Sequence, residues 1–116
     1  MRVSRDFRFE AAHRLENYGG KCEALHGHSW RLRVTVDAPV GENGLAFDFV
    51  ELERIVREKV LALLDHSYLN DHLSPPSAER VALWVWDRLA DLPLAEIRVW
   101  ETPECVVTYD GKENDR

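Results

Sequence analysis

Three of the five histidines lie where two extended segments of the chain come together. His13 ends one segment of alternating apolar residues, and His26 and His28 begin the next. Residues two apart on a strand project to the same side, and residues opposite each other on paired strands lie about 5 Å apart. If the segments pair so that Phe9 faces Trp30, then His13 faces His26 and the three imidazoles converge on one point.

Three neutral imidazoles with an open fourth position suit catalytic zinc, which polarises an oxygen or makes bound water more acidic. We therefore predict that His13, His26 and His28 bind Zn²⁺. Cys22 precedes His26 by four residues and could act as a fourth ligand, which would make the zinc site closed and structural. The residue pattern leaves both metal interpretations open.

Two strands are needed to position these histidines, and period-two alternation of apolar residues predicts them over residues 3–13 and 27–37. Residues 14–25 join the two strands. This connection is too long for a tight hairpin and contains two adjacent glycines, so we expect it to have a functional role.

The second half of the sequence predicts two helices and then two more strands. Asp48 with Glu51 forms a capping-box pattern before a helix that reaches about Leu64, and a Ser-Pro-Pro-Ser break at 74–77 caps a second helix that ends before Pro93. Alternation returns over residues 95–101 and 105–109. The order β-β-α-α-β-β predicts a single α+β domain over residues 1–116, with a four-stranded antiparallel sheet and two helices on one face.

Composition excludes several classes of function. The 116 residues have a net charge of -6 and no basic cluster, which disfavours nucleic-acid binding. No apolar run approaches the roughly 20 residues of a membrane span, and no secretory signal follows Met1, so we expect a cytoplasmic protein. Cys22 and Cys105 are then expected to be free thiols. The edges of so small a sheet favour assembly into a homo-oligomer.

Four motifs resemble the 6-pyruvoyltetrahydropterin synthase superfamily. They are Phe-Glu-Ala-Ala-His-Arg-Leu at 9–15, Cys-Glu-Ala-Leu-His-Gly-His at 22–28, Leu-Asp-His-Ser-Tyr-Leu-Asn at 64–70 and Trp-Glu-Thr at 100–102. The Cys-x-x-x-His-Gly-His spacing resembles the bacterial branch, the 6-carboxy-5,6,7,8-tetrahydropterin synthases of queuosine and 7-deazapurine biosynthesis. The resemblance implies a tunnelling-type fold and a homohexamer built as a dimer of trimers.

The resemblance also implies roles for individual residues. The three histidines match zinc ligands that hold the side-chain hydroxyls of a dihydropterin, and Cys22 matches the thiol that abstracts a proton. A thiol beside a dication loses its own proton more readily, which suits that role. Asp65 and His66 match a proton relay that a neighbouring subunit supplies. The alternative for this pair is a purely local one, a histidine at a helix C-terminus with an aspartate cap.

Substrate recognition is assigned in the same way. Glu101 follows Ile97 and Val99 on the inward register, where a carboxylate is costly unless it is paired. The resemblance implies that it accepts hydrogen bonds from the 2-amino and ring N–H groups of the pterin. Lys21 and Arg14 flank the expected site and could contact a triphosphate, or be solvated surface charges. Ser77 stands where relatives often have threonine, which puts hydroxyl contacts to the pterin there in doubt.

The activity implied is conversion of 7,8-dihydroneopterin 3′-triphosphate to 6-carboxytetrahydropterin, acetaldehyde and triphosphate. A pyruvoyl synthase would eliminate triphosphate and keep the three-carbon side chain, and a side-chain aldolase of folate synthesis is a third outcome. A zinc-stabilised assembly module without turnover, its metal closed by Cys22, is the alternative outside the enzymes. His72 and Cys105 match no role, and we expect a surface histidine and a packed thiol.

Overall fold

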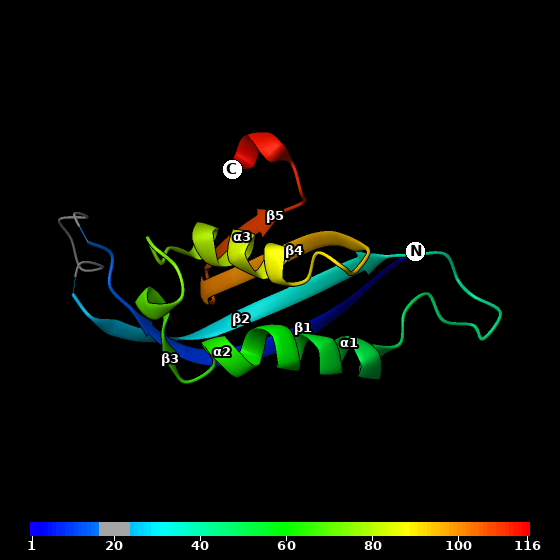
Figure 1. Cartoon of the computed structure of the whole chain (residues 1–116), viewed down its shortest axis with the longest axis horizontal. Coiled ribbons are helices and arrows are strands. Elements are labelled where there is room, and N and C mark those ends of the chain that lie inside the picture. The colour runs from blue at the N-terminus through cyan, green and yellow to red at the C-terminus, as the bar shows by residue number, and fades with distance from the viewer. Residues whose placement is uncertain (17–23) are drawn as a thin grey trace.

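One twisted sheet of five strands organises the protein, in a computed structural model that describes residues 1–16 and 24–116 (Figure 1). The order across the sheet is β3-β1-β2-β4-β5. The strands span β1 Arg2–His13, β2 His26–Asp37, β3 Ser67–Tyr68, β4 Leu94–Thr102 and β5 Cys105–Tyr109.

The pairing of β1 with β2 has the register predicted from the sequence. The strands run antiparallel, with Phe9 opposite Trp30 and His13 opposite His26. β2 pairs with β4 on its other side, and that ladder stops at Arg31 opposite Trp100. Beyond this point the His26 end of β2 has no partner in β4, so the sheet opens there.

Both predicted helices are present on one face of the sheet (Figure 1). The first runs as α1 (Phe49–Val56), a π-helical turn (Arg57–Leu61) and α2 (Ala62–Leu64), and the second is α3 (Ala78–Arg88). Short 3-10 turns span Leu69–Asp71 and Glu113–Asp115.

The predicted N-caps are confirmed, with one difference. The Asp48 side chain accepts from the Val50 amide, and the Ser77 hydroxyl accepts from the Arg80 amide. Glu51 pairs with the Arg54 side chain in place of the N-cap amide, so only half of the expected capping box forms. The nearby arginine offers a charged partner, which competes with a single backbone N–H.

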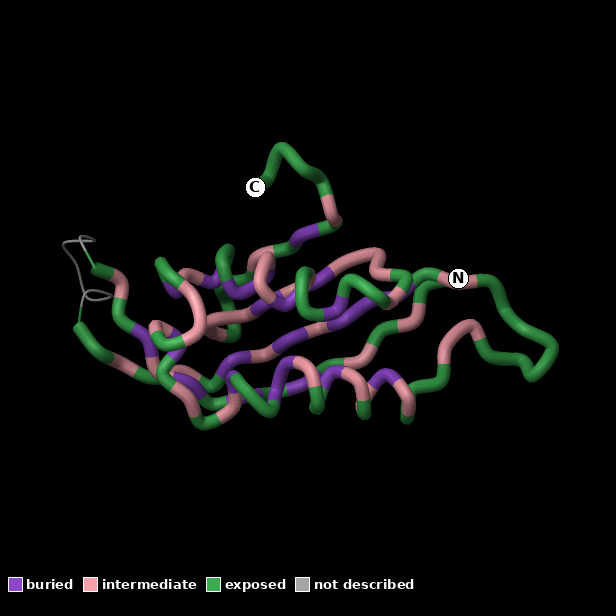
Figure 2. The backbone as a smooth tube through the Cα atoms, in the orientation of Figure 1, coloured by how far each residue is buried: buried purple, intermediate pink, exposed green. Residues whose placement is uncertain are grey.

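The core lies between the sheet and the helices, where the inward sides of the strands meet the inward faces of the helices (Figure 2). Trp30, Leu32 and Val34 on β2 are fully buried, and they alternate with more accessible polar residues. Phe9 stacks on Trp30 with ring centroids 5.8 Å apart. This packing holds the two histidine-bearing strands in one register, because a slip of one residue would turn every core side chain outward.

The four-stranded antiparallel sheet that the sequence predicts is wrong in one respect. A fifth strand, β3, pairs with β1 in parallel, with Ser67 opposite Ala11 and Tyr68 opposite Ala12. The amide of His66 begins this contact by donating to the Glu10 carbonyl at 2.6 Å. Two residues are too few to show alternation, so local sequence contains no signal for this strand.

No helix in the described ranges, 1–16 and 24–116, has both the length and the apolar character needed to cross a membrane.

Candidate metal centre and active site

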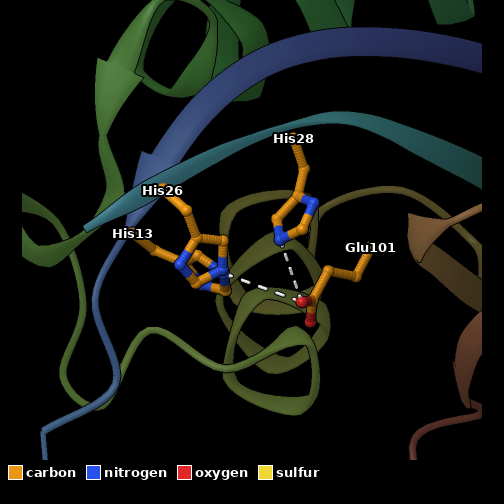
Figure 3. A group of neighbouring side chains, drawn as sticks. All are labelled: His13, His26, His28 and Glu101. Atoms are coloured by element: carbon orange, nitrogen blue, oxygen red, sulfur yellow. Dashed lines mark hydrogen bonds and ion pairs between the residues drawn. The ribbon is translucent and has the colours of Figure 1, made fainter. Parts of the chain in front are cut away.

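The three histidines predicted to converge do so at the open end of the β1–β2 pair (Figure 3). Together with Glu101 of β4 they place four possible ligand atoms within 4.8 Å of one another. His13 is completely buried, and His28 and Glu101 are about one-fifth exposed, at 21% and 22%. The group is therefore a pocket of donors at the edge of the core, open on one side.

Backbone carbonyls hold two of the imidazole rings in one tautomer. Nδ1 of His13 donates to the Pro76 carbonyl at 2.8 Å, and Nδ1 of His26 donates to the Ala24 carbonyl at 2.6 Å. A carbonyl oxygen only accepts, so the proton of each neutral ring is on Nδ1. The Nε2 lone pairs of both rings are then free to face the group, an arrangement common in metal-binding histidines.

The geometry of the lone pairs favours a positive charge between the two rings. Nε2 of His13 and Nε2 of His26 lie 2.9 Å apart. With both Nδ1 positions protonated, two lone pairs face each other at that distance, which is unfavourable unless a cation or a shared proton lies between them. A part-buried pair of acceptors in contact is thus a site suited to a metal ion.

His28 is the third donor, and its environment keeps it neutral. Burial lowers the pKa of His28, and the neighbouring rings of His26 and His13 lower it further, although the Glu101 carboxylate opposes them. Its Nε2 is inaccessible to solvent and has no hydrogen bond among the described residues. A neutral imidazole with an unsatisfied ring nitrogen is the form that binds a metal.

Glu101 lies on the inward register, as predicted, and its carboxylate faces two of the histidine rings. Its Oε1 is 3.1 Å from Nε2 of His28 and 3.7 Å from Nε2 of His13 (Figure 3). These contacts are ion pairs only when the rings are protonated, so the carboxylate still favours a cation or N–H donors beside it. Arg98, three residues before it and on the opposite face of β4, pairs with Glu96 at 2.6 Å.

Three histidine nitrogens and one carboxylate are a donor set that fits zinc, which takes nitrogen and oxygen ligands in tetrahedral sites. The described residues could therefore hold a metal ion through the three histidines, with Glu101 as a fourth ligand or as a carboxylate beside the open position.

Asp65 and His66 lie at the other edge of the sheet, beside β1, and outside the group of four donors. Oδ1 of Asp65 accepts from the Glu10 amide at 2.9 Å and lies 3.1 Å from Nδ1 of His66. His66 has a positive φ of 59° and a side chain that is 79% exposed. Such a conformation is strained for a residue other than glycine, and strain of this kind occurs often at functional sites.

The remaining predicted site residues fall in different places. Cys22, expected as the catalytic thiol, and Lys21, expected to contact substrate, both lie outside the described residues. Arg14 lines a hollow with Tyr68 and Asn70, and its backbone is tied to the Asn70 amide group by two hydrogen bonds. Cys105, expected to be packed, is an exposed free thiol on edge strand β5.

Sequence reasoning missed the two carbonyls that orient the rings. Pro76 is 63 residues from His13 in the chain, and its carbonyl carries no side-chain signal. The Ser-Pro-Pro-Ser break was visible only as a helix start, and its second function, orienting a histidine, depends on the packing of α3 against the sheet.

A cavity of about 300 Å³ adjoins the donor group where β2 and β4 separate. His28, Trp30 and Glu101 line it on the side of the donors, and Trp100, Thr102 and Pro103 line it along β4. It combines aromatic walls, a carboxylate and possible metal ligands, which suits a planar ring with polar substituents.

Comparisons with known proteins agree with this architecture. Residues 2–112 match the family model described as 6-pyruvoyl tetrahydropterin synthase. A 6-carboxy-5,6,7,8-tetrahydropterin synthase from Synechocystis is 38% identical over 92% of this chain and 91% of its own length. A dihydroneopterin monophosphate aldolase from Pyrococcus furiosus is 34% identical over 83% of this chain and 85% of its own length. The solved structure of 6-pyruvoyl tetrahydropterin synthase from Caenorhabditis elegans has a TM-score of 0.85 and 26% identity, and the match covers 97% of this chain and 96% of that one.

The donor geometry predicts that His26→Ala will lose most of the bound metal from protein loaded with Zn²⁺, because one of the facing nitrogens is removed. Metal content after gel filtration measures the loss, and the circular dichroism spectrum should stay close to that of the unsubstituted protein. His72→Ala, which removes a histidine outside the group, is the matched control and should retain its zinc. Full retention of zinc by the His26 variant would remove this site.

Proposed function

The chain belongs to the 6-pyruvoyl tetrahydropterin synthase family, and from that premise we propose that it is a zinc-dependent carbon–carbon lyase. The proposed reaction converts 7,8-dihydroneopterin 3′-triphosphate to 6-carboxy-5,6,7,8-tetrahydropterin, acetaldehyde and triphosphate, a step of queuosine and 7-deazapurine biosynthesis. The observation that carries the proposal is the convergence of His13, His26 and His28 beside a cavity that also contains Glu101. The name and 38% identity of the Synechocystis relative support this branch of the family.

In this proposal His13, His26 and His28 hold the zinc, and Glu101 fixes the pterin ring. Bound zinc would polarise the hydroxyls of the substrate side chain and make the adjacent C–H more acidic. A carboxylate that accepts two N–H bonds from the pterin would set the ring in one orientation. Glu101 would then exchange its contacts with His28 and His13 for contacts with the pterin.

Proton transfer is assigned to Cys22, Asp65 and His66. Cys22 as thiolate would remove a proton from the side chain, and His66 would return protons to the pterin. The contact between Oδ1 of Asp65 and Nδ1 of His66, at 3.1 Å, would orient that ring. These roles rest on the match of motifs.

The proposal places the complete site between subunits of a homohexamer. Asp65 and His66 lie by β3, at the opposite edge of the sheet from β5, while the donor group includes Glu101 of β4. The His66 side chain is 79% exposed and could reach a neighbouring copy. If a neighbouring copy supplied Asp65 and His66, a domain of 116 residues could complete the site with groups from two subunits.

A second candidate function is cleavage or elimination with a different product. The 34% identity to the aldolase from Pyrococcus furiosus favours an aldolase as this second candidate. Such an enzyme would cleave the side chain without forming the carboxylated pterin. A 6-pyruvoyl synthase would instead eliminate triphosphate and retain the side chain. The three outcomes differ in the mass of the pterin and in the aldehyde released.

The first prediction concerns the products. Zinc-loaded protein incubated with 7,8-dihydroneopterin 3′-triphosphate is expected to release acetaldehyde and triphosphate and to form 6-carboxytetrahydropterin, as mass spectrometry of the pterin and trapping of the aldehyde will show. The Cys22→Ala protein should keep its zinc and lose at least about two orders of magnitude in kcat, the usual contribution of a general acid or base. Loss of zinc and fold together in Cys22→Ala would favour the non-catalytic module.

The second prediction concerns Glu101. Each charge-assisted hydrogen bond to the pterin is worth about 1.5–3 kcal/mol, so Glu101→Ala should lower kcat/KM by at least about tenfold. The substituted protein should remain folded and retain zinc through its three histidines, which metal analysis will test. Glu96→Ala removes a carboxylate from the opposite face of the same strand and should leave kcat/KM unchanged. An unchanged kcat/KM in Glu101→Ala would refute the pterin-anchor role.

The third prediction concerns the shared site. Cys22→Ala and His66→Ala proteins are each expected to be inactive, and mixing them under conditions of subunit exchange should restore part of the activity, because some interfaces then combine an intact thiol with an intact relay. Mass spectrometry of isotopically labelled subunits verifies exchange. Continued inactivity after exchange has been demonstrated would mean that both groups act within one chain.

A further inference from the structure

Two arginines stand directly opposite each other on the sheet face that has no helix. Arg8 of β1 and Arg31 of β2 are cross-strand partners in the antiparallel ladder. Like charges at opposed positions destabilise a sheet, so such a pair needs compensation from nearby acids or from a bound anion. The placement is notable in a chain whose net charge is -6.

The acids nearby compensate only one member of the pair. Asp6 lies 2.6 Å from Nη2 of Arg31 and 2.7 Å from Nε of Arg33, and these two guanidinium groups lower the pKa of its carboxyl group. The other candidate, Glu10, accepts hydrogen bonds from the Ser29 hydroxyl. Within the part of the chain that is described, the side chain of Arg8 has no hydrogen bond and no ion pair.

Arg31 is held rigidly at this position. Besides its contact with Asp6, its guanidinium lies 4.2 Å from the centroid of the Trp100 ring. A cation fixed by a carboxylate and an aromatic face loses little freedom when it binds a ligand. The pair therefore combines the fixed guanidinium of Arg31 with the guanidinium of Arg8, whose N–H donors have no partner among the described residues.

Both arginines line the same cavity as the donor group. The cavity of about 300 Å³ between β2 and β4 is bounded by Arg8 and Arg31 as well as by His28 and Glu101. It exists because the β2–β4 ladder stops at Arg31 and Trp100, after which β4 has an irregularity in its register. A ligand in this opening can therefore meet the metal donors and the two arginines at once.

We propose that Arg8 and Arg31 form the subsite that binds the triphosphate arm of the substrate. This inference rests on the proposed function for the identity of the ligand. A linear triphosphate carries several negative charges, and the planar fork of a guanidinium binds phosphate oxygens in pairs. Binding would remove the repulsion between the two arginines. Released inorganic triphosphate has the same chemistry, so the subsite also binds this product.

Calorimetric titration with inorganic triphosphate tests the subsite without any turnover. The probe is added to zinc-loaded protein, and the zinc content is measured after each titration so that chelation is not counted as binding. Arg8→Gln is expected to raise Kd at least tenfold, equal to about 1.4 kcal/mol. Arg98→Gln is the matched control, because Arg98 lies on the same sheet face but pairs with Glu96 outside the cavity. An unchanged Kd in Arg8→Gln, or an equal increase in Arg98→Gln, overturns the subsite.

Two pterin ligands, one with and one without the triphosphate, distinguish binding of the substrate arm from binding of the free product. They also test the subsite separately from the proposed function. Arg8→Gln should raise KM for dihydroneopterin triphosphate at least tenfold and leave the Kd of dihydroneopterin without phosphates unchanged. If KM does not change while inorganic triphosphate binds more weakly, the site serves the product alone and the substrate-arm proposal fails. If the unsubstituted protein binds triphosphate through Arg8 but turns over no pterin, the subsite stands and the proposed function fails.

Discussion

The structure depends on a close contact between the facing imidazole nitrogens of two histidines. Nε2 of His13 and Nε2 of His26 face each other at 2.9 Å because the opposite nitrogen of each ring donates to a backbone carbonyl. Two lone pairs at this distance are unfavourable without a positive charge between them. The carbonyls of Pro76 and Ala24, the neutral state of His28 and the nearby Glu101 carboxylate all suit a cation at that point.

The core provides the rigidity that this contact needs. Phe9 and Trp30 pack together four residue pairs along the ladder from the histidine pair, and His13 also contacts Trp30 edge to face, with centroids 5.1 Å apart. A shift of one residue between β1 and β2 would expose the core and separate the imidazoles in the same step. The free energy that stabilises the fold therefore also maintains the geometry of the site.

The chemistry of the site is divided between the two sides of the β1–β2 pair. On the β4 side, the early end of the β2–β4 ladder opens the cavity that holds Glu101 and brings the opposed arginines, Arg8 and Arg31, to its lining. On the other side, β3 places the strained and exposed His66 beside Glu10. A single sheet thus places the donor group and its cavity on one side and the strained His66 on the other.

Much of this protein was determined by sequence patterns of short range. Period-two alternation predicted the main strands and, through the pairing of Phe9 with Trp30, the meeting of three histidines, while Asp48 and Ser77 marked the helix starts. The motif resemblance indicated the family, which the match over residues 2–112 confirmed. Tertiary structure alone decided which carbonyl orients His13, that Glu101 contacts His28, that β3 joins the sheet and that Arg8 has no acidic partner among the described residues. The reason is that alternation and capping depend on neighbours in the chain, whereas these contacts join groups far apart in sequence whose distance is set by how helices and strands pack.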